Sequence, residues 1–241
     1  MTGKIKRACA ALALAGLCLL AGCKSAGGGL AGGGAVSRPA QVESAELQFT
    51  RPAPGDTVAI FDTSAGVFRA VLFPDEAPQT CENFIGLAQA GYYDGLTITR
   101  AEAGFVVEAG RGADGSVATV WGGSGCPPEY TDRLHHYAGA LCAAAAEDGL
   151  SYSVFYVVQA APGSVGQELA DQMAAAGWRQ EVIDGYAAAG GAPYLDYTDT
   201  VFGQVYEGME TVDAIAAADV DENGAPLEAV TIHSVAIETY G

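Results

Sequence analysis

Few side chains in this 241-residue chain are suited to covalent or metal chemistry, and their spacing excludes most of it. Beyond the N-terminal segment the cysteines are Cys81, Cys126 and Cys142, and no two of them have the C-x2-C spacing typical of a metal site. Their odd number leaves two alternatives open, one disulfide with a spare thiol or three separate thiols. His135 and His136 have no partner at ligand spacing, so we expect loop or surface residues. The sequence therefore predicts no metal site.

Cys23 is a candidate for lipid attachment. Residues 4–7 carry three positive charges and precede an apolar run over 8–21, which is too short to span a bilayer and fits an export signal. The run ends in Leu20-Ala21-Gly22-Cys23, which resembles the lipobox of bacterial lipoproteins. In that family the signal peptide, here residues 1–22, is removed and the cysteine is acylated, and several acyl chains anchor a protein firmly. The alternative is an ordinary cleaved signal in which the cysteine stands by chance.

The net charge excludes nucleic acid as a partner. Lys and Arg number 11 against 29 Asp and Glu, a formal net charge of −18, whereas a phosphate-backbone binder needs basic residues. Loss of residues 1–22 removes three basic residues and no acidic one, which leaves a mature chain of −21 whose only lysine is Lys24. Because such a chain does not adhere to anionic lipid electrostatically, we expect membrane attachment only through the N-terminal lipid.

The elements that must position the remaining side chains begin near residue 56. Residues 23–55 are rich in Gly, Ala, Ser and Pro without a hydrophobic period, which predicts a flexible tether. Residues 56–241 read as one domain of many strands and few helices, a pattern typical of a β-barrel or sandwich. The expected strands are 58–61, 67–73, 97–99, 105–108, 139–143, 154–158, 200–206 and 230–237, and the expected helices are 78–90 and 211–218.

Residues 164–189 interrupt this pattern. Two helix-like stretches over 165–176 and 179–189 flank Gly177, which predicts a helical insertion on a barrel loop. We expect it to act as a lid or packing element. Its acidic residues are expected to form a solvated face: Glu168, Asp171, Glu181 and Asp184.

The segment 73–84 reads FPDEAPQTCENF, which resembles the F-P-x-x-A-P-x-T-x-x-N-F pattern of the cyclophilin family of peptidyl-prolyl isomerases. Further matches follow in the same order at 91–96, 100, 104–105, 139–141, 195–196, 200–203 and 205–209. The resemblance spans residues 57–239. It implies a mainly β fold, a closed eight-stranded antiparallel barrel capped by two helices, with substrate bound on the outer face.

The resemblance also implies which residues form the site. Arg100 takes the position of the family's catalytic arginine, Phe105 and Leu195 match residues of the proline pocket, and Tyr194 stands where many members have tryptophan. Phe155 and Tyr156 match a pair of phenylalanines, the second of which is the pocket wall. The implied substrate contacts are Phe105, Glu108, Ala144, Phe155, Tyr156, Tyr194 and Leu195.

Several positions depart from the family pattern. Thr99 replaces a histidine, Ala145 an asparagine that contacts substrate backbone, Val154 a glutamine and Asp199 a late pocket histidine. Glu108 replaces the glutamine that helps hold the arginine. It has two interpretations, because a carboxylate can either hold Arg100 through a charge-assisted hydrogen bond or occupy the donors that substrate needs.

The implied reaction needs no covalent step and no cofactor. Rotation of an X–Pro amide crosses a barrier of about 18–20 kcal/mol because C–N conjugation is lost. A donor beside the prolyl nitrogen stabilises the twisted state selectively, and Arg100 carries a permanently charged fork of donors. Without the resemblance, the favoured interpretation of Arg100 is a surface arginine paired with an acid, and that of the aromatic residues is core.

We therefore expect a monomeric, extracytoplasmic prolyl isomerase, anchored by lipid to the bacterial membrane and acting on proline-containing exported or unfolded polypeptides. The alternative is a catalytically weak or inactive cyclophilin-fold module that binds peptides as a chaperone, which the changes at Glu108, Ala145 and Val154 favour. A small-molecule receptor of a transporter fits poorly, since such receptors are usually two-domain α/β proteins.

Overall fold

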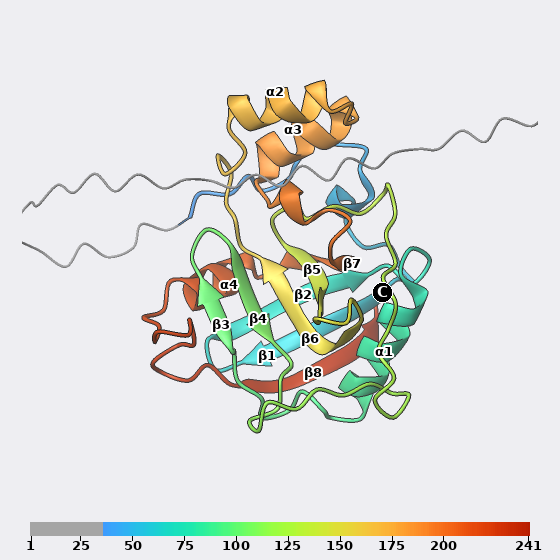
Figure 1. Ribbon diagram of the computed structural model, residues 1–241, viewed down its shortest axis with the longest axis vertical. Coiled ribbons are helices and arrows are strands. Elements are labelled where there is room, and N and C mark those ends of the chain that lie inside the picture. The colour runs from blue at the N-terminus through green and yellow to red at the C-terminus, as the bar shows by residue number, and fades with distance from the viewer. Residues whose placement is uncertain (1–35) are drawn as a thin grey trace, which may run out of the picture. The chain divides into compact units, whose positions relative to one another are not determined.

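The computed structural model describes residues 36–241 (Figure 1). The expected signal peptide, the lipidation site at Cys23 and residues 24–35 of the expected tether lie outside the described residues. Within 36–241, no helix has both the length and the apolar character needed to cross a membrane.

Eight antiparallel strands form one curled sheet, which confirms the predicted fold class. The order across the sheet is β3-β4-β6-β5-β7-β2-β1-β8. The outer strands of this order are β3 and β8, and the residues just before each of them hydrogen-bond to one another. Thr97 forms a bridge with Thr231, and Ile98 N–H donates to the Val230 carbonyl at 2.9 Å. The strands are β1 (Thr57–Thr63), β2 (Gly66–Leu72), β3 (Arg100–Glu102), β4 (Val106–Ala109), β5 (Ala140–Ala145), β6 (Ser151–Val158), β7 (Thr200–Glu207) and β8 (Ile232–Thr239).

Two helices cap the barrel. The helix α1 (Pro78–Gln89) packs on β8 and β6, and α4 (Met209–Ala216) packs on β2 and β4. Glu129 caps the start of α1, because its carboxylate accepts hydrogen bonds from the backbone N–H groups of Gln79 and Thr80 at 3.0 and 2.8 Å and from the Thr80 hydroxyl at 2.8 Å. The backbone bonds satisfy donors that a helix start leaves unpaired, and the negative charge suits the positive end of the helix dipole.

The predicted insertion is confirmed as a helical pair between β6 and β7. It consists of α2 (Gln167–Ala175) and α3 (Gln180–Ala189), which lie together at one end of the barrel in Figure 1. Their apolar residues pack against Tyr137 and Phe49 in a separate small core that contains Val165, Met173, Val182, Ile183 and Tyr186. The acids predicted for a solvated face are exposed, namely Glu168, Asp171, Glu181 and Asp184.

The predicted tether is wrong over residues 36–55, which pack on the domain. Leu47 begins a short 3-10 helix (Leu47–Phe49) and joins the apolar cluster on the outer barrel face. Arg38 is paired with Asp213 at 2.6 Å, and the buried Glu46 is paired with Arg179 of the insertion at 2.6 Å. The Gln48 side chain donates to Gln204 Oε1 at 2.8 Å. Because the segment is held by single side chains, its sequence shows no repeating spacing of apolar residues. Its composition was therefore the only signal, and it predicted a flexible segment.

The three cysteines of the described residues are all free and buried, which settles the alternative that the sequence left open. They occupy different parts of the domain. Cys81 lies on α1 and Cys142 on β5, while Cys126 pairs by backbone with Ser151. Burial raises the pKa of the Cys81 thiol to about 12, so this group is an inert apolar side chain at neutral pH.

Candidate functional site

A row of directly opposed residues crosses four neighbouring strands on the outer barrel face. Arg100 on β3 lies opposite Glu108 on β4, Glu108 opposite Tyr156 on β6, and Tyr156 opposite Cys142 on β5. Side chains of opposed residues point to the same face of a sheet. The row therefore aligns Arg100, Glu108 and Tyr156, which are far apart in the sequence, on one surface.

Arg100 is half-exposed and makes two contacts. Its guanidinium carbon lies 5.2 Å from the centroid of the Phe105 ring, a cation–π distance. Its Nη2 donates to the carboxylate of Glu102, on the same strand. Because a guanidinium has five N–H donors, this ion pair leaves donors free for another acceptor.

Glu108 fits neither interpretation drawn from the sequence. Among the described residues it makes no hydrogen bond to Arg100; its Oε1 accepts one from the Thr99 hydroxyl at 3.4 Å. Burial raises the pKa of the Glu108 carboxyl, and the opposing influence of Arg100 and Arg111 does not offset it. The acid that forms an ion pair with Arg100 is Glu102, for which the sequence predicted no role.

Apolar side chains lie beside Arg100. The Tyr194 ring is two-thirds exposed and stacks on Phe105, with ring centroids 6.2 Å apart. Phe105, Ala144 and Leu195 are half-buried and pack against the cluster of buried residues that contains Tyr156. The structure thus brings together Phe105, Glu108, Ala144, Tyr194 and Leu195 on the outer face, whereas Tyr156, which is 4% exposed, lies beneath that surface.

Phe155 lies on the other face of β6. It is 4% exposed and packs inside the barrel against Phe61, Phe84 and Tyr93. Successive residues of a strand point to opposite faces, so Tyr156 faces outward and its neighbour faces inward. The structure therefore corrects the prediction that Phe155 contacts substrate. Phe155 is a core residue beneath the site.

Asp199 fixes the position of Tyr156. The Tyr156 hydroxyl donates to Asp199 Oδ2 at 2.8 Å, and the backbone N–H of Ala145 donates to Asp199 Oδ1 at 2.9 Å. Burial raises the pKa of the Tyr156 hydroxyl, so it remains a neutral donor to the carboxylate. The aspartate that replaces a family histidine thus holds the ring of Tyr156 by its hydroxyl.

His135 and His136 lie in a loop, as expected, but they are not surface residues, since they are 4% and 1% exposed. Each Nδ1 lies 2.7 Å from an oxygen of Asp196, and because an ionised carboxylate only accepts, each Nδ1 carries the proton. The Tyr186 hydroxyl from α3 donates to the same carboxylate at 2.9 Å. Although burial raises the pKa of the Asp196 carboxyl, the bonds from the two histidines hold it below its usual range.

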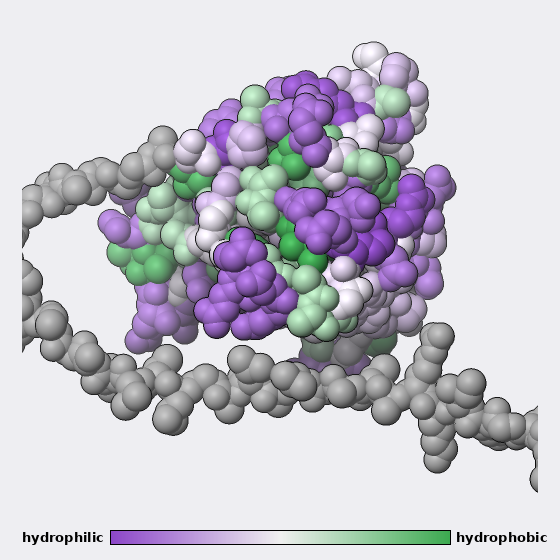
Figure 2. All heavy atoms as spheres, turned by 90° about the horizontal axis from the view of Figure 1, so that it is seen from above, coloured by the Kyte–Doolittle hydropathy of each residue, from purple (hydrophilic) through white to green (hydrophobic). Residues whose placement is uncertain are grey.

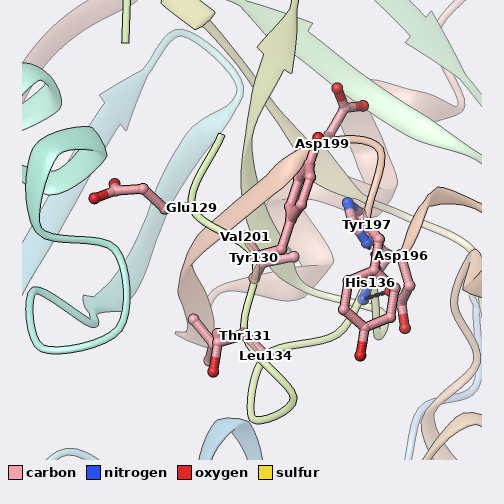
Figure 3. A pocket seen from close by; sticks show the side chains of 9 residues that line it. All are labelled: Glu129, Tyr130, Thr131, Leu134, His136, Asp196, Tyr197, Asp199 and Val201. Atoms are coloured by element: carbon pink, nitrogen blue, oxygen red, sulfur yellow. Dashed lines mark hydrogen bonds and ion pairs between the residues drawn. The ribbon is translucent and has the colours of Figure 1, made fainter. Parts of the chain in front are cut away.

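A small pocket lies between the Asp196 cluster and Asp199. Its cavity of about 10 Å³ is lined by nine residues, and Figure 3 shows His136 and Asp196 on one side of it and Glu129 on the other. This is room for about one water molecule. The His136 ring also stacks on Tyr156, with centroids 6.3 Å apart, so the cluster supports the back of the site. Sequence offered no signal for this, because Asp196 is sixty residues away from His136.

Chemically, the site offers a charged donor, Arg100, beside an apolar surface. Within residues 36–241, no group of three or more His, Cys, Asp or Glu side chains is arranged to hold a metal ion. The arrangement suits binding and electrostatic stabilisation of a polar group on an apolar ligand.

The sequence of residues 58–237 matches the family model described as cyclophilin type peptidyl-prolyl cis-trans isomerase/CLD. Among curated relatives, a "putative peptidyl-prolyl cis-trans isomerase" of Staphylococcus aureus (strain USA300) is 35% identical over 188 residues, which are 76% of this chain and 93% of that protein. A protein of the same name from Staphylococcus saprophyticus is 37% identical over 183 residues, 74% of this chain and 90% of that protein.

Solved structures show the same fold. A cyclophilin type peptidyl-prolyl cis-trans isomerase of Cryptosporidium parvum, crystallised in the presence of the dipeptide Ala-Pro, aligns with a TM-score of 0.59 and 19% identity over 76% of this chain and 99% of that one. A second structure of that enzyme aligns with a TM-score of 0.60 and 18% identity, over 77% of this chain and 99% of that one.

Proposed function

Because the chain belongs to the family of cyclophilin-type peptidyl-prolyl cis-trans isomerases, we propose that it accelerates X–Pro isomerisation in exported polypeptides, with Arg100 as the donor to the twisted amide. The observation that carries this proposal is the arrangement of Arg100 over Phe105 on the same barrel face as Tyr156 and Leu195.

The mechanism is non-covalent. As the X–Pro bond rotates, the prolyl nitrogen loses conjugation and gains a lone pair that accepts a hydrogen bond. A guanidinium N–H of Arg100 donates to that lone pair and is of little use to the planar ground state, so it lowers the barrier. The ring of Phe105 and the side chain of Leu195 contact the proline ring, and Tyr156, which is 4% exposed, supports them from beneath. The half-buried Phe105 fixes the guanidinium from below.

Glu102 must share Arg100 with the substrate. The pair is surface-exposed, with 41% of the Arg100 side chain and 52% of the Glu102 side chain accessible. Replacing a hydrogen bond between Arg100 and Glu102 by one to the substrate therefore costs little free energy. A substrate carbonyl or prolyl nitrogen then takes one of the remaining N–H groups of Arg100. We infer that Glu102 orients the guanidinium while leaving the reaction possible.

The place of action follows from residues 1–23. The positive n-region, the apolar run and the Leu-Ala-Gly-Cys ending support export, cleavage before Cys23 and acylation of that residue. The protein would then act as a lipid-anchored monomer on the outer side of the bacterial membrane, on proline-containing polypeptides as they fold. No cofactor enters the mechanism.

A second candidate function is peptide binding without useful turnover. The ion pair of Arg100 with Glu102 and the exposed Ala145, which has no side-chain amide, favour it. In that case the protein holds proline-containing segments as a chaperone does.

The deciding experiment is NMR exchange spectroscopy on Ala-Pro peptides with the full-length protein, because it measures isomerisation without a coupled protease. We expect acceleration that falls by about 100-fold or more in Arg100→Ala, as for removal of a single transition-state donor. Binding of the peptide without acceleration would establish the second candidate. Acceleration unchanged in Arg100→Ala would refute the mechanism.

A further inference from the structure

A second cavity lies where the insertion meets the loop before β5. It has a volume of about 260 Å³, and its walls are Trp178, Arg179 and Val182 of the insertion with Asp132, His135 and Tyr197. Residues 177–182 belong to the insertion that interrupts the family motifs. The cavity is therefore a feature that the insertion adds to the domain.

The cavity adjoins the proposed proline site. Tyr197 lies two residues beyond Leu195 and lines both this cavity and the small pocket of Figure 3. Asp199, which holds the hydroxyl of Tyr156, lines the same small pocket. Tyr197 therefore connects the cavity with Asp199 and, through Asp199, with the buried Tyr156 beneath the proposed proline site.

The charge of Arg179 is already neutralised. Its Nη1 donates to Glu46 Oε1 at 2.6 Å, and its Nη2 donates to Glu46 Oε2 at 3.1 Å and to the Asp132 carbonyl at 2.8 Å. This arginine therefore fixes the wall of the cavity and offers little attraction to an anionic ligand.

Asp132 and the aromatic residues set the chemistry that remains. The Asp132 side chain is exposed, accepts one hydrogen bond from the Tyr197 hydroxyl at 2.6 Å, and forms no ion pair within residues 36–241. Trp178 is half-buried and Tyr197 is 52% exposed. A carboxylate beside two aromatic rings attracts a cation that carries an apolar stem.

We propose that this cavity is a subsite for a lysine or arginine side chain of the polypeptide substrate, with its charged end beside Asp132 and its methylene stem against Trp178, Tyr197 and Val182. The inference rests on the proposed function, since the polypeptide is the one whose proline occupies the neighbouring site. The net charge of −18 favours the approach of basic segments. Figure 2, which looks onto the molecule from above, shows hydrophilic residues around small hydrophobic patches.

The test compares matched peptides with the full-length protein. Each contains one Ala-Pro unit and carries either lysine or the uncharged, similarly long norleucine at successive positions on either side. NMR titration gives the affinity, and exchange spectroscopy gives the isomerisation rate. At one position we expect lysine to bind about fivefold more tightly at low salt, an advantage that shrinks as salt is added.

Two variants connect this advantage to the cavity. Asp132→Asn keeps the shape of an exposed side chain and is expected to bring the lysine and norleucine affinities to within about twofold. The matched control is Asp184→Asn, an exposed carboxylate on α3 that does not line the cavity, and it should keep the full preference. Trp178→Ala should weaken the lysine and the norleucine peptides alike, because it removes apolar surface that both stems contact.

The outcomes separate this inference from the proposed function. Equal affinity for lysine and norleucine at every position, or a preference that survives Asp132→Asn, overturns the subsite even if the isomerase activity is present. Tighter binding of norleucine overturns the basic specificity as well. Absence of acceleration with every peptide refutes the isomerase function, while a lysine preference lost in Asp132→Asn still establishes the subsite through binding.

Discussion

Glu108 lies directly opposite Arg100 across the β3–β4 pair, yet the two side chains do not share a hydrogen bond within the described residues. The carboxyl is partly buried, and burial raises its pKa above the ordinary value despite Arg100 and Arg111. An ionised Glu108 therefore attracts Arg100 without fixing it, whereas a protonated Glu108 has the shape and the neutral charge of glutamine.

We predict that Glu108→Gln increases kcat/KM for Ala-Pro peptides several-fold. The substitution removes a negative charge that faces Arg100 from the neighbouring strand, so more of the guanidinium charge is available to the twisted amide. The same reasoning predicts that activity of the unmodified protein rises as the pH falls through the raised pKa of Glu108, because the protonated form resembles glutamine. The measurement is the pH dependence of isomerisation by exchange spectroscopy.

The variant itself is the control for this pH dependence. In Glu108→Gln the activity should be flat over the same range, since the titrating group is gone. The variant retains Asp199, whose negative charge also raises the pKa of Glu108, so the comparison isolates the titration of Glu108 itself. An identical pH profile in the two proteins would assign the titration to another group and contradict the prediction.

We predict that Asp199→Ala lowers the free energy of unfolding by about 1–3 kcal/mol, because it leaves the buried Tyr156 hydroxyl without an acceptor. Urea denaturation at neutral pH measures this change. Asp148 offers a matched control, since it accepts a similar bond of 2.7 Å from the exposed hydroxyl of Tyr152. Asp148→Ala should have no measurable effect, because water replaces the lost partner; equal losses in both variants would disprove the role of burial.

The order of strands and helices could be predicted from the sequence because each element has its own local pattern. The run 67–73 is rich in β-branched and aromatic residues, and β2 covers Gly66–Leu72. Proline begins α1 as predicted, since its fixed φ suits the first helical position. The short strand β3 is Arg100–Glu102 and not 97–99, because that earlier segment forms an isolated bridge at Thr97 and single backbone hydrogen bonds from Ile98 and Thr99.

The two faces of a strand were harder to assign. The run Val154–Val158 is continuously apolar, so alternation does not show which of Phe155 and Tyr156 faces outward. That choice depends on register with β5 and β4, which places Tyr156 opposite Cys142 and Glu108. The buried positions of His135 and His136 likewise depend on Asp196, a partner that only the folded chain brings close.

We predict that Asp196→Asn lowers the free energy of unfolding at pH 7 by about 1–3 kcal/mol, since an amide has one oxygen to accept from two imidazoles. The pKa of the Asp196 carboxyl is lowered in the folded state, so its stabilising effect is present above the ordinary value of an aspartate, about 3.9, and is lost as the pH falls through the lowered value. The difference between the two proteins should therefore shrink below about pH 4. Urea denaturation at a series of pH values checks this, and a constant difference down to acid pH would rule out the ionised carboxylate as its source.

The ion pair between Glu46 and Arg179 is asymmetric, which leads to a last prediction. The Glu46 side chain is 6% exposed and the Arg179 side chain is 47% exposed. Arg179→Ala leaves a buried carboxylate without its partner, and we expect a loss of about 2–3 kcal/mol, below that of a fully buried pair because water reaches the vacated place. Glu46→Gln leaves a guanidinium that water can solvate, so its cost should be about 1 kcal/mol or less.

Because the pair joins residues 44–50 to the insertion, Arg179→Ala should also accelerate amide hydrogen exchange in α2 and α3 more than in β5 and β6. Equal losses of stability in the two variants would contradict the asymmetry of the pair. Uniform exchange across the domain would show that the pair does not hold the insertion in place.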